Sequence, residues 1–465
     1  MRDFKLLIDG QLEAGDLTLD VINPATEEVF ATCARASSKQ LDRAVAAANR
    51  AFPSWSNTSM AARRAALQKI ADLIEAHVSE LARLLTQEQG KPIADATGEV
   101  AGLAAFFRYF TTLDLPVEVI EDTPERKVEL HRKPLGVIAA IIPWNFPLIL
   151  IGLKVPPALL AGNTVILKPA PTTPLSTLRL AEFLKDALPP GVLNVIADAN
   201  DLGDALTSHP DIRKISFTGS TATGKKVMAS AAKTLKRITL ELGGNDAAIV
   251  LDDVDPSAAA PDIFQGAFMN SGQVCGAIKR LYVHESIYDR MCDELAALAT
   301  AAVVGDGLEQ GTQLGPLQNK MQFEKVKALI ESARADGTLL AGGEAPRRGY
   351  FIRPIIVRDI SDGTRLVDEE QFGPVLPVIR YSDLDDAIRR ANASPYGLGG
   401  SVWSSNREKA RAIALRMETG MVWINKHPDV APHIPGGGAK QSGIGIEMGQ
   451  DGLNEFTQLQ VINIR

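Results

Sequence analysis

Two side chains of the sequence, one thiol and one carboxylate, have types that together could carry covalent catalysis. Cys275 ends the glycine-bearing segment 268–275, and Glu241 lies upstream within 240–244. A thiolate can attack an electrophilic carbon, and a carboxylate can then activate the water that releases the covalent adduct. A lone intracellular cysteine is more often a packing residue, so the thiol needs supporting neighbours. On this interpretation Cys275 is the candidate nucleophile and Glu241 the candidate general base.

A third polar side chain lies in a rigid turn. Pro143 and Pro147 flank Asn145 directly after the apolar run 136–142, a pattern that predicts a buried strand ending in a turn. A side-chain amide held there could donate a hydrogen bond to a developing oxyanion. An asparagine between prolines is also ordinary turn chemistry. Asn145 is therefore the oxyanion candidate, together with the backbone N–H of Cys275.

Seven ordered motifs make the chain resemble the aldehyde dehydrogenase superfamily over nearly its whole length. They are residues 143–147, 168–169, 217–221 with Gly224, 241–244, 272–275, 370–374 and 437–443. The resemblance implies an NAD(P)-dependent enzyme of the non-acylating, hydrolytic type, which oxidises an aldehyde to a carboxylic acid. Cys275 would form a thiohemiacetal and then a thioester, and water activated by Glu241 would hydrolyse the thioester. Lys154 resembles a lysine near the path of that water.

Three alternatives have other chemistry. A relative that passes the thioester to coenzyme A commonly lacks the general base, so Glu241 favours hydrolysis. A catalytically idle binding protein on the same fold is disfavoured because Cys275, Asn145 and Glu241 are all present. A cofactor-free cysteine hydrolase needs a histidine to activate the thiol, and none of the six histidines lies in these motifs.

Alternating strand and helix patterns predict an α/β fold with two Rossmann-like domains. We expect a cofactor-binding domain over 1–113 and 135–243 and a catalytic domain over 244–446, so that Glu241 and Cys275 face one crevice. The expected strands are 137–142, 164–167, 192–196, 214–217, 247–250, 280–283, 351–357 and 375–381. The expected helices are 38–51, 60–88, 175–188, 288–302 and 322–335, and one that starts near Leu148.

The remaining residues, 114–134 and 447–465, are assigned to an oligomerisation arm. Within them 116–133 and 459–464 alternate in the manner of an exposed β-ribbon. An isolated ribbon is marginally stable and needs a partner surface. The resemblance implies that this surface belongs to another subunit, in a homodimer or homotetramer.

The segment 219–226 nearly matches the phosphate-binding P-loop motif, but Lys226 occupies the position where Ser or Thr would bind magnesium. A strand followed by a helix still offers backbone N–H groups to a phosphate, so the segment suits NAD or NADP. In many NAD-using relatives a glutamate lies three residues beyond Lys168, and here that position is Pro171, which permits NADP without demanding it. The resemblance implies that the cofactor contacts are Ile142, Trp144, Lys168, Ala170, Pro171, Gly219, Ser220, Leu242, Gly243, Glu370 and Phe372.

The aldehyde itself is not determined by motifs. Relatives often carry an aromatic residue before the glycine pair near the C-terminus, whereas here Gly436 follows Pro435, which removes bulk from the expected substrate mouth. The segment 426–433 could supply polar contacts to the aldehyde or could be a solvated loop. By analogy the substrate contacts are Phe146, Leu150, Leu153, Met269 and Gly436.

Length and composition limit the number of domains, the kinds of partner and the compartment that are expected. A chain of 465 residues predicts two domains, and a net charge of −7 with intermixed signs gives no basic field for nucleic acid or membrane lipids. Three scattered cysteines disfavour disulfides and metal clusters and indicate a reducing compartment. Residues 1–5 lack the apolar core of a signal peptide, and the uncharged run 135–153 is interrupted by Pro143, Asn145 and Pro147. We therefore expect a cytoplasmic protein without a bound metal.

Overall fold

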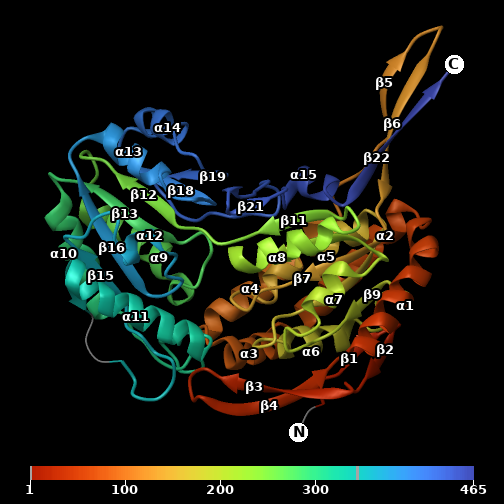
Figure 1. Cartoon of the computed structure of the whole chain (residues 1–465), viewed down its shortest axis with the longest axis horizontal. Coiled ribbons are helices and arrows are strands. Elements are labelled where there is room, and N and C mark those ends of the chain that lie inside the picture. The colour runs from red at the N-terminus through yellow and green to blue at the C-terminus, as the bar shows by residue number, and fades with distance from the viewer. Residues whose placement is uncertain (1–2, 342–344) are drawn as a thin grey trace.

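The computed structural model describes residues 3–341 and 345–465 and has two α/β lobes with a long ribbon projecting from one of them (Figure 1). Met1 and Arg2, part of the segment considered above for a signal peptide, lie outside the described residues. The predicted fold class is confirmed. No helix in the described ranges is long and apolar enough to cross a bilayer.

The first lobe is built on an eight-stranded sheet in the order β2-β1-β9-β8-β7-β10-β11-β21. Its central strands are parallel, and β7 and β8 are buried along their whole length, as expected for a parallel sheet covered by helices. The strands are β1 Leu6–Ile8, β2 Gln11–Glu13, β7 Val137–Ile141, β8 Thr164–Lys168, β9 Leu193–Val195, β10 Ile212–Thr218, β11 Arg237–Glu241 and β21 Gly443–Ile444.

Helices α1 to α4 and α5 to α8 pack around this sheet and its core. The single helical stretch predicted over 60–88 is two helices, because His77 leaves helical geometry with a ψ of 17°. The helix expected to start near Leu148 is instead a 3₁₀ turn followed by α5, whose first turn contains Pro156. The helices are α1 Ser38–Ser56, α2 Met60–Ala76, α3 Val78–Gln89, α4 Ile93–Phe110, α5 Val155–Leu160, α6 Leu175–Leu184, α7 Gly203–Ser208 and α8 Thr221–Ala232.

The second lobe carries a seven-stranded sheet in the order β14-β15-β16-β13-β12-β18-β19. The predicted strand 351–357 is shorter than expected and begins after Pro354, which has no N–H to donate. The strands are β12 Asp246–Val250, β13 Ile278–His284, β14 Thr338–Ala341, β15 Ile355–Arg358, β16 Val375–Tyr381, β18 Gly399–Trp403 and β19 Met421–Ile424. The helices are α9 Pro256–Phe268, α10 Tyr288–Ala301, α11 Lys320–Asp336, α12 Arg365–Asp368, α13 Leu384–Asn392 and α14 Arg407–Ala414.

After β19 the chain returns to the first lobe. β20 (Ala439–Lys440) pairs with β17 (Tyr396–Gly397), and β21 then joins the edge of the eight-stranded sheet beside β11. Helix α15 (Gly449–Asn454) follows, and the core of the first lobe includes Met448, Leu453 and Phe456. Residues 447–456 therefore pack with the first lobe, whereas the sequence analysis assigned all of 447–465 to the arm.

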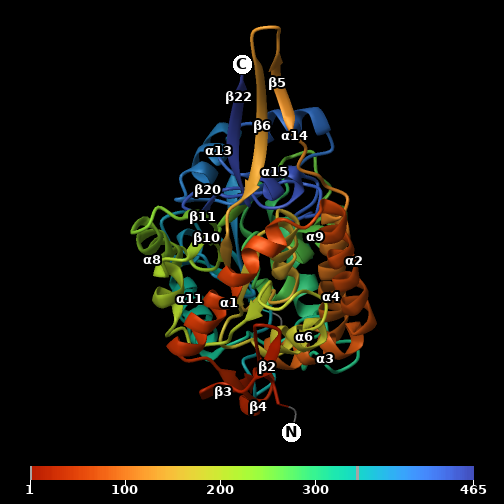
Figure 2. The same ribbon diagram turned by 90° about the vertical axis from the view of Figure 1, so that its right-hand side faces the viewer.

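The ribbon is a three-stranded antiparallel sheet in the order β22-β6-β5, with bounds Thr457–Ile464, Lys127–Pro134 and Glu118–Asp122. It presents the exposed apolar side chains Val117, Val119, Ile120, Leu459, Val461, Ile462 and Ile464. Strands β3 (Leu17–Asn23) and β4 (Glu28–Arg35), which the sequence analysis did not anticipate, form a hairpin at the opposite end of the molecule (Figure 2).

Candidate active site

Cys275 lies in a sharply turned loop between α9 and β13. The 3₁₀ turn Met269–Gly272 contains Asn270 and Ser271 with positive φ angles of 50° and 56°. Such backbone is sparsely populated and needs support from its surroundings. The side chain of Gln273 gives that support by donating to the carbonyl of Asn270 at 2.9 Å. The loop leaves the Cys275 residue half-buried.

The turn that carries Asn145 meets this loop directly. The buried Asn145 side chain donates from Nδ2 to the carbonyl of Gln273 at 3.0 Å. In return the Asn270 side chain donates to the main-chain carbonyl of Asn145 at 3.1 Å. The first lobe and the cysteine loop of the second are thus joined by reciprocal hydrogen bonds, which hold Asn145 against the loop that leads to Cys275.

Glu241 is the last residue of β11, at the carboxyl edge of the first sheet. Its main-chain carbonyl accepts from the N–H of Gly219 at 3.0 Å. Burial raises the pKa of its carboxyl well above the ordinary value, and the negative charge of Glu447 adds to the rise while Lys154 opposes it. The charge of Glu241 in turn acts on Cys275, so both candidate catalytic groups share one electrostatic environment.

Glu447 is a residue that the sequence analysis missed. Its buried carboxylate lies 2.6 Å from Nζ of the equally buried Lys154, and Ser216 lies between them within hydrogen-bond distance of both. No local pattern around Glu447 signals this role, because the returning C-terminal segment brings it beside Glu241. Lys154 lies close enough to Glu241 for its charge to lower the pKa of that carboxyl.

The thiol of Cys275 is protonated in the resting site. Burial raises the pKa of Cys275 to about 12, and the charges of Glu241, Asp246 and Glu370 add to the rise. The ammonium group of Lys279 acts in the opposite direction. Lys279, also missed from the sequence, donates to the carbonyls of Val274 and Cys275 and so lies directly beneath the loop.

A cavity of about 640 Å³ in the first lobe is lined by Lys168, one of the residues expected to contact the cofactor. Lys168, Phe217 and Val227 are among its lining residues, and Ser220 caps the N-terminus of α8 at its edge. The Nζ of Lys168 lies 2.6 Å from Oδ1 of the fully buried Asp198, a partner that the sequence analysis did not find. Ile142 donates its N–H to the carbonyl of Lys168, and Ala170 and Pro171 follow that strand.

The residues expected to contact the nicotinamide lie where the two lobes meet. The rings of Trp144 and Phe372 meet edge to face with centroids 5.4 Å apart. One carboxylate oxygen of Glu370 accepts from the N–H of Gly244 at 3.0 Å, and a Cβ on Gly243 would lie 2.6 Å from the other. Because Gly243 has no side chain, Glu370 can approach the end of β11. The side chain of Leu242 is buried and packs against Gly224.

The candidate substrate residues are less closely grouped. Phe146, Leu150, Leu153 and Met269 are half-buried, and Leu150 lies in the 3₁₀ turn Ile149–Ile151. Gly436 is buried, and a Cβ there would meet the side chains of Met421 at 2.9 Å and Met448 at 3.0 Å.

The segment 426–433 is not simply a solvated loop. The side chain of His427 is fully buried, and its Nε2 lies 2.9 Å from the carbonyl of Gly276 beside the cysteine loop. The His427 ring also packs edge to face on Trp423, with centroids 4.8 Å apart. The segment therefore begins with a residue anchored under the candidate active site.

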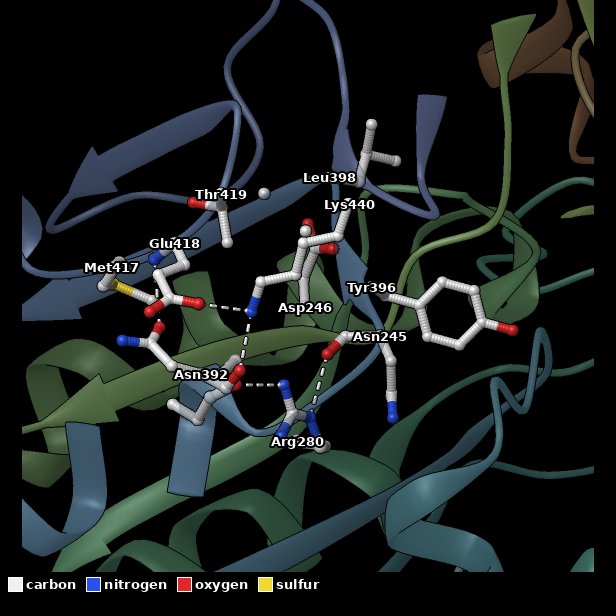
Figure 3. A pocket seen from close by; sticks show the side chains of 14 residues that line it. Asn245, Asp246, Arg280, Asn392, Tyr396, Leu398, Met417, Glu418, Thr419 and Lys440 are labelled. Atoms are coloured by element: carbon white, nitrogen blue, oxygen red, sulfur yellow. Dashed lines mark hydrogen bonds and ion pairs between the residues drawn. The ribbon is translucent and has the colours of Figure 1, made fainter. Parts of the chain in front are cut away.

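A narrow pocket of about 10 Å³ lies below the cysteine loop in the second lobe, a space on the scale of one water molecule. Asp246 lines it, and burial raises the pKa of that carboxyl to about 6. Figure 3 shows Lys440 over the pocket, held between the carboxylate of Glu418 and the carbonyl of Asn392. Within the described ranges, no group of three or more histidine, cysteine or acidic side chains is placed to hold a metal ion.

Comparison with known proteins identifies the family. The pattern of the aldehyde dehydrogenase family matches residues 12–462. The chain belongs to the aldehyde dehydrogenase family. An aldehyde dehydrogenase of a Fusarium species is 41% identical over 99% of this chain and 98% of its own length. The phenylacetaldehyde dehydrogenase of Pseudomonas fluorescens is 42% identical over 97% of this chain and 94% of its own.

Solved aldehyde dehydrogenases have the same fold. An NAD⁺ complex of the enzyme from Bacillus cereus superposes with a TM-score of 0.97 at 37% identity, over all of this chain and 97% of its own. A betaine aldehyde dehydrogenase of Staphylococcus aureus with NAD⁺ superposes with a TM-score of 0.95 at 34% identity, over 99% of this chain and 94% of its own. The aldehyde dehydrogenase described here is accordingly an oxidoreductase that oxidises an aldehyde with NAD(P).

Proposed function

We propose that this enzyme oxidises its aldehyde through a thioester on Cys275, which water activated by Glu241 then hydrolyses to a carboxylic acid. The observation that carries the proposal is the convergence of three groups where the lobes meet. Asn145 is hydrogen-bonded into the cysteine loop, and Glu241 is close enough to influence the pKa of Cys275. A nucleophile, an oxyanion donor and a base in one site are the set required for acyl transfer.

Several residues fit an NAD(P) cofactor. The 640 Å³ cavity and the N-terminus of α8 suit its adenosine and pyrophosphate, and Glu370 with the ring pair Trp144 and Phe372 suits its nicotinamide end. When bound, NAD(P)⁺ accepts a hydride from the substrate carbon. The protein binds and orients both partners and keeps bulk water from the thiol.

The first covalent step is attack of the Cys275 sulfur on the aldehyde carbon. The thiol first passes its proton to a water molecule in the site, and Lys279 is the cationic group whose charge lowers the pKa of the thiol. The carbonyl oxygen then becomes an oxyanion, which the Nδ2 amide of Asn145 and the N–H of Cys275 stabilise. In the resting site the Asn145 amide already donates to the carbonyl of Gln273, so it is held against the cysteine loop without substrate.

Hydrolysis of the thioester depends on Glu241. Its carboxyl has a raised pKa because it is buried and lies near Glu447, which makes its ionised form a stronger base than an ordinary glutamate. It removes a proton from water, the hydroxide attacks the thioester carbon, and the carbon–sulfur bond breaks. The products are the carboxylic acid and free Cys275. Transfer to coenzyme A, the alternative outcome, would not need this base.

For the substrate we propose a small aldehyde with an apolar or aromatic body. Phe146, Leu150, Leu153 and Met269 are half-buried beside the site, and Gly436 adds no bulk. One relative is named for phenylacetaldehyde and another, from Arabidopsis thaliana, for succinate semialdehyde. Turnover rates measured with both kinds of aldehyde would distinguish these substrate classes. A preference for the semialdehyde would refute an apolar substrate.

We also propose a cytoplasmic homo-oligomer, a dimer or a tetramer, that assembles through the ribbon. The exposed apolar side chains of β5 and β22 need a partner surface. Light scattering should give a molar mass that is a multiple of the chain mass, and Val461→Glu should reduce that molar mass. An unchanged molar mass would refute the ribbon as the contact between subunits. The three free cysteines suit a reducing compartment, and cell fractionation tests this location.

The decisive experiment follows the absorbance of reduced nicotinamide with purified enzyme, NAD or NADP, and the aldehyde panel, with and without coenzyme A. Turnover without coenzyme A is expected, and Cys275→Ala should abolish it. Cys292→Ala is the matched control, because Cys292 is buried in α10 and should leave turnover intact. Full activity of the Cys275 variant, or a strict need for coenzyme A, would overturn the proposal.

A further inference from the structure

A buried ion pair lies directly behind the turn that carries Asn145. Lys91, between α3 and α4, pairs with Glu99 of α4, and the side chains are 0% and 2% exposed. Removing two charges from water is costly, and a buried pair of this kind is weak evidence for stability by itself. The other hydrogen bonds that the two groups make indicate what the pair does.

Both members of the pair hold the main chain of the turn. The Nζ of Lys91 donates to the carbonyl of Asn145 at 3.0 Å and lies 3.8 Å from the centre of the Phe146 ring. On the far side of Pro147, the Oε1 of Glu99 accepts from the N–H groups of Leu148 at 2.9 Å and Ile149 at 3.1 Å. The pair therefore clamps the turn on both sides of its second proline.

The clamp also touches the second lobe. The N–H of Ile93 donates to the carbonyl of Gly307 at 2.9 Å. A Cβ added at Gly307 would come within 2.4 Å of the Lys91 carbonyl, and one at Gly315 within 2.0 Å of the Gly90 carbonyl. These contacts leave the backbone of Lys91 little freedom to shift.

We propose that Lys91 and Glu99 are a positioning pair that fixes the Asn145 amide for the oxyanion. This inference rests on the proposed role of Asn145. Glu99 neutralises the charge of Lys91, and the ammonium group bonds to the main-chain carbonyl of Asn145, so the pair acts by fixing the turn. Oxyanion donors are effective because they need no reorganisation during the reaction, and that advantage is lost if the turn is free to shift.

The test is a double-mutant cycle between the pair and Asn145. Lys91→Met with Glu99→Gln removes both charges at similar volume and leaves an oxygen for the two backbone N–H groups. In the wild-type background we expect the burst rate of reduced-nicotinamide formation and kcat/KM for the aldehyde to fall about 10- to 100-fold. The dissociation constant of the cofactor, measured by fluorescence, should remain unchanged.

In the Asn145→Ala background the same double change should cost less than about threefold, because the group that the pair positions is already gone. Additive losses in the two backgrounds would overturn the inference. If Asn145→Ala itself left the burst rate unchanged, the proposed function of Asn145 would fail instead, so the two failures are distinguishable.

Two further variants separate positioning from stability. Glu88→Gln is the matched control, because buried Glu88 likewise accepts two backbone N–H groups, from Leu175 and Ser176. It should leave the aldehyde burst rate unchanged, and an equal loss there would contradict a specific role for Glu99. If the double variant is unstable, Glu99→Asp keeps both charges but withdraws the carboxylate from the turn, and it should show the same dependence on Asn145.

Discussion

The ammonium nitrogen of Lys154 lies 2.6 Å from the Oε1 of Glu447, and both side chains are buried beside Glu241. Lys154 lowers and Glu447 raises the pKa of the Glu241 carboxyl, so the ion pair adjusts the basicity of the proposed base from a distance. The two members are 293 residues apart in the sequence and meet only because the C-terminal segment returns to the first lobe.

Glu447→Gln should therefore move the pH dependence of turnover. Loss of the nearby negative charge lowers the pKa of Glu241, and because Glu241 acts as a base when ionised, the acidic limb of the kcat profile should move to lower pH. Steady-state rates across the pH range measure this shift. A limb that stays in place or moves to higher pH would contradict the electrostatic role.

Glu241→Gln should separate the two halves of the reaction. Attack by Cys275 and formation of reduced nicotinamide do not need the base, so a single-turnover burst should persist. Steady-state turnover should fall by roughly 10²- to 10⁴-fold, the range of a general base. Rapid-mixing absorbance resolves both phases. Disappearance of the burst together with turnover would mean that Glu241 is needed earlier, for example to activate the thiol.

Pro171→Glu should change the choice of cofactor. A carboxylate at this position, three residues after Lys168, would accept hydrogen bonds from ribose hydroxyls and repel a 2′-phosphate. We expect the ratio of the NADP to the NAD dissociation constant to rise about tenfold. Pro171→Gln is the control, because it has similar size and no charge. An equal effect of both variants would show that shape, not charge, governs the selectivity.

Glu88 should make the stability of the enzyme depend on pH. Burial raises the pKa of Glu88 from 4.5 to about 7. Between these values the folded chain keeps a proton that the unfolded chain releases, so the free energy of unfolding falls as pH rises, by up to about 3 kcal/mol. Thermal unfolding at about pH 5 and pH 7 should show a smaller drop in Tm for Glu88→Gln than for wild type. An identical drop would refute the assignment.

The residues that sequence reasoning found are those whose chemistry is local. Cys275, Asn145 and Glu241 stand in short motifs with prolines or glycines, because a reacting group needs a rigid turn beside it. Glu447 and Lys279 carry no such pattern. Their roles depend on which segments pack against the site, and no spacing along the chain records that packing.

The secondary-structure elements that were predicted are likewise those with a clear local pattern in the sequence. Long apolar runs such as β7 and β16 were predicted, whereas β18 was missed because it opens with two glycines, which are poor strand formers. The break at His77 has no glycine or proline to mark it. The hairpin β3–β4 was missed although Leu17, Leu19 and Val21 of β3 alternate with Thr18 and Asp20, a period typical of a strand.

The position of β21 has a consequence for how the protein is made. The first lobe needs Gly443 and Ile444 to complete its sheet beside Glu241, and it needs Leu453 and Phe456 in its core. A ribosome delivers these residues only after the entire second lobe has emerged. Until residues 443–456 have been synthesised, the first lobe lacks its edge strand β21, whereas the second lobe can already fold. Synthesis of residues 443–456, and not of residue 243, is the event that completes the first lobe.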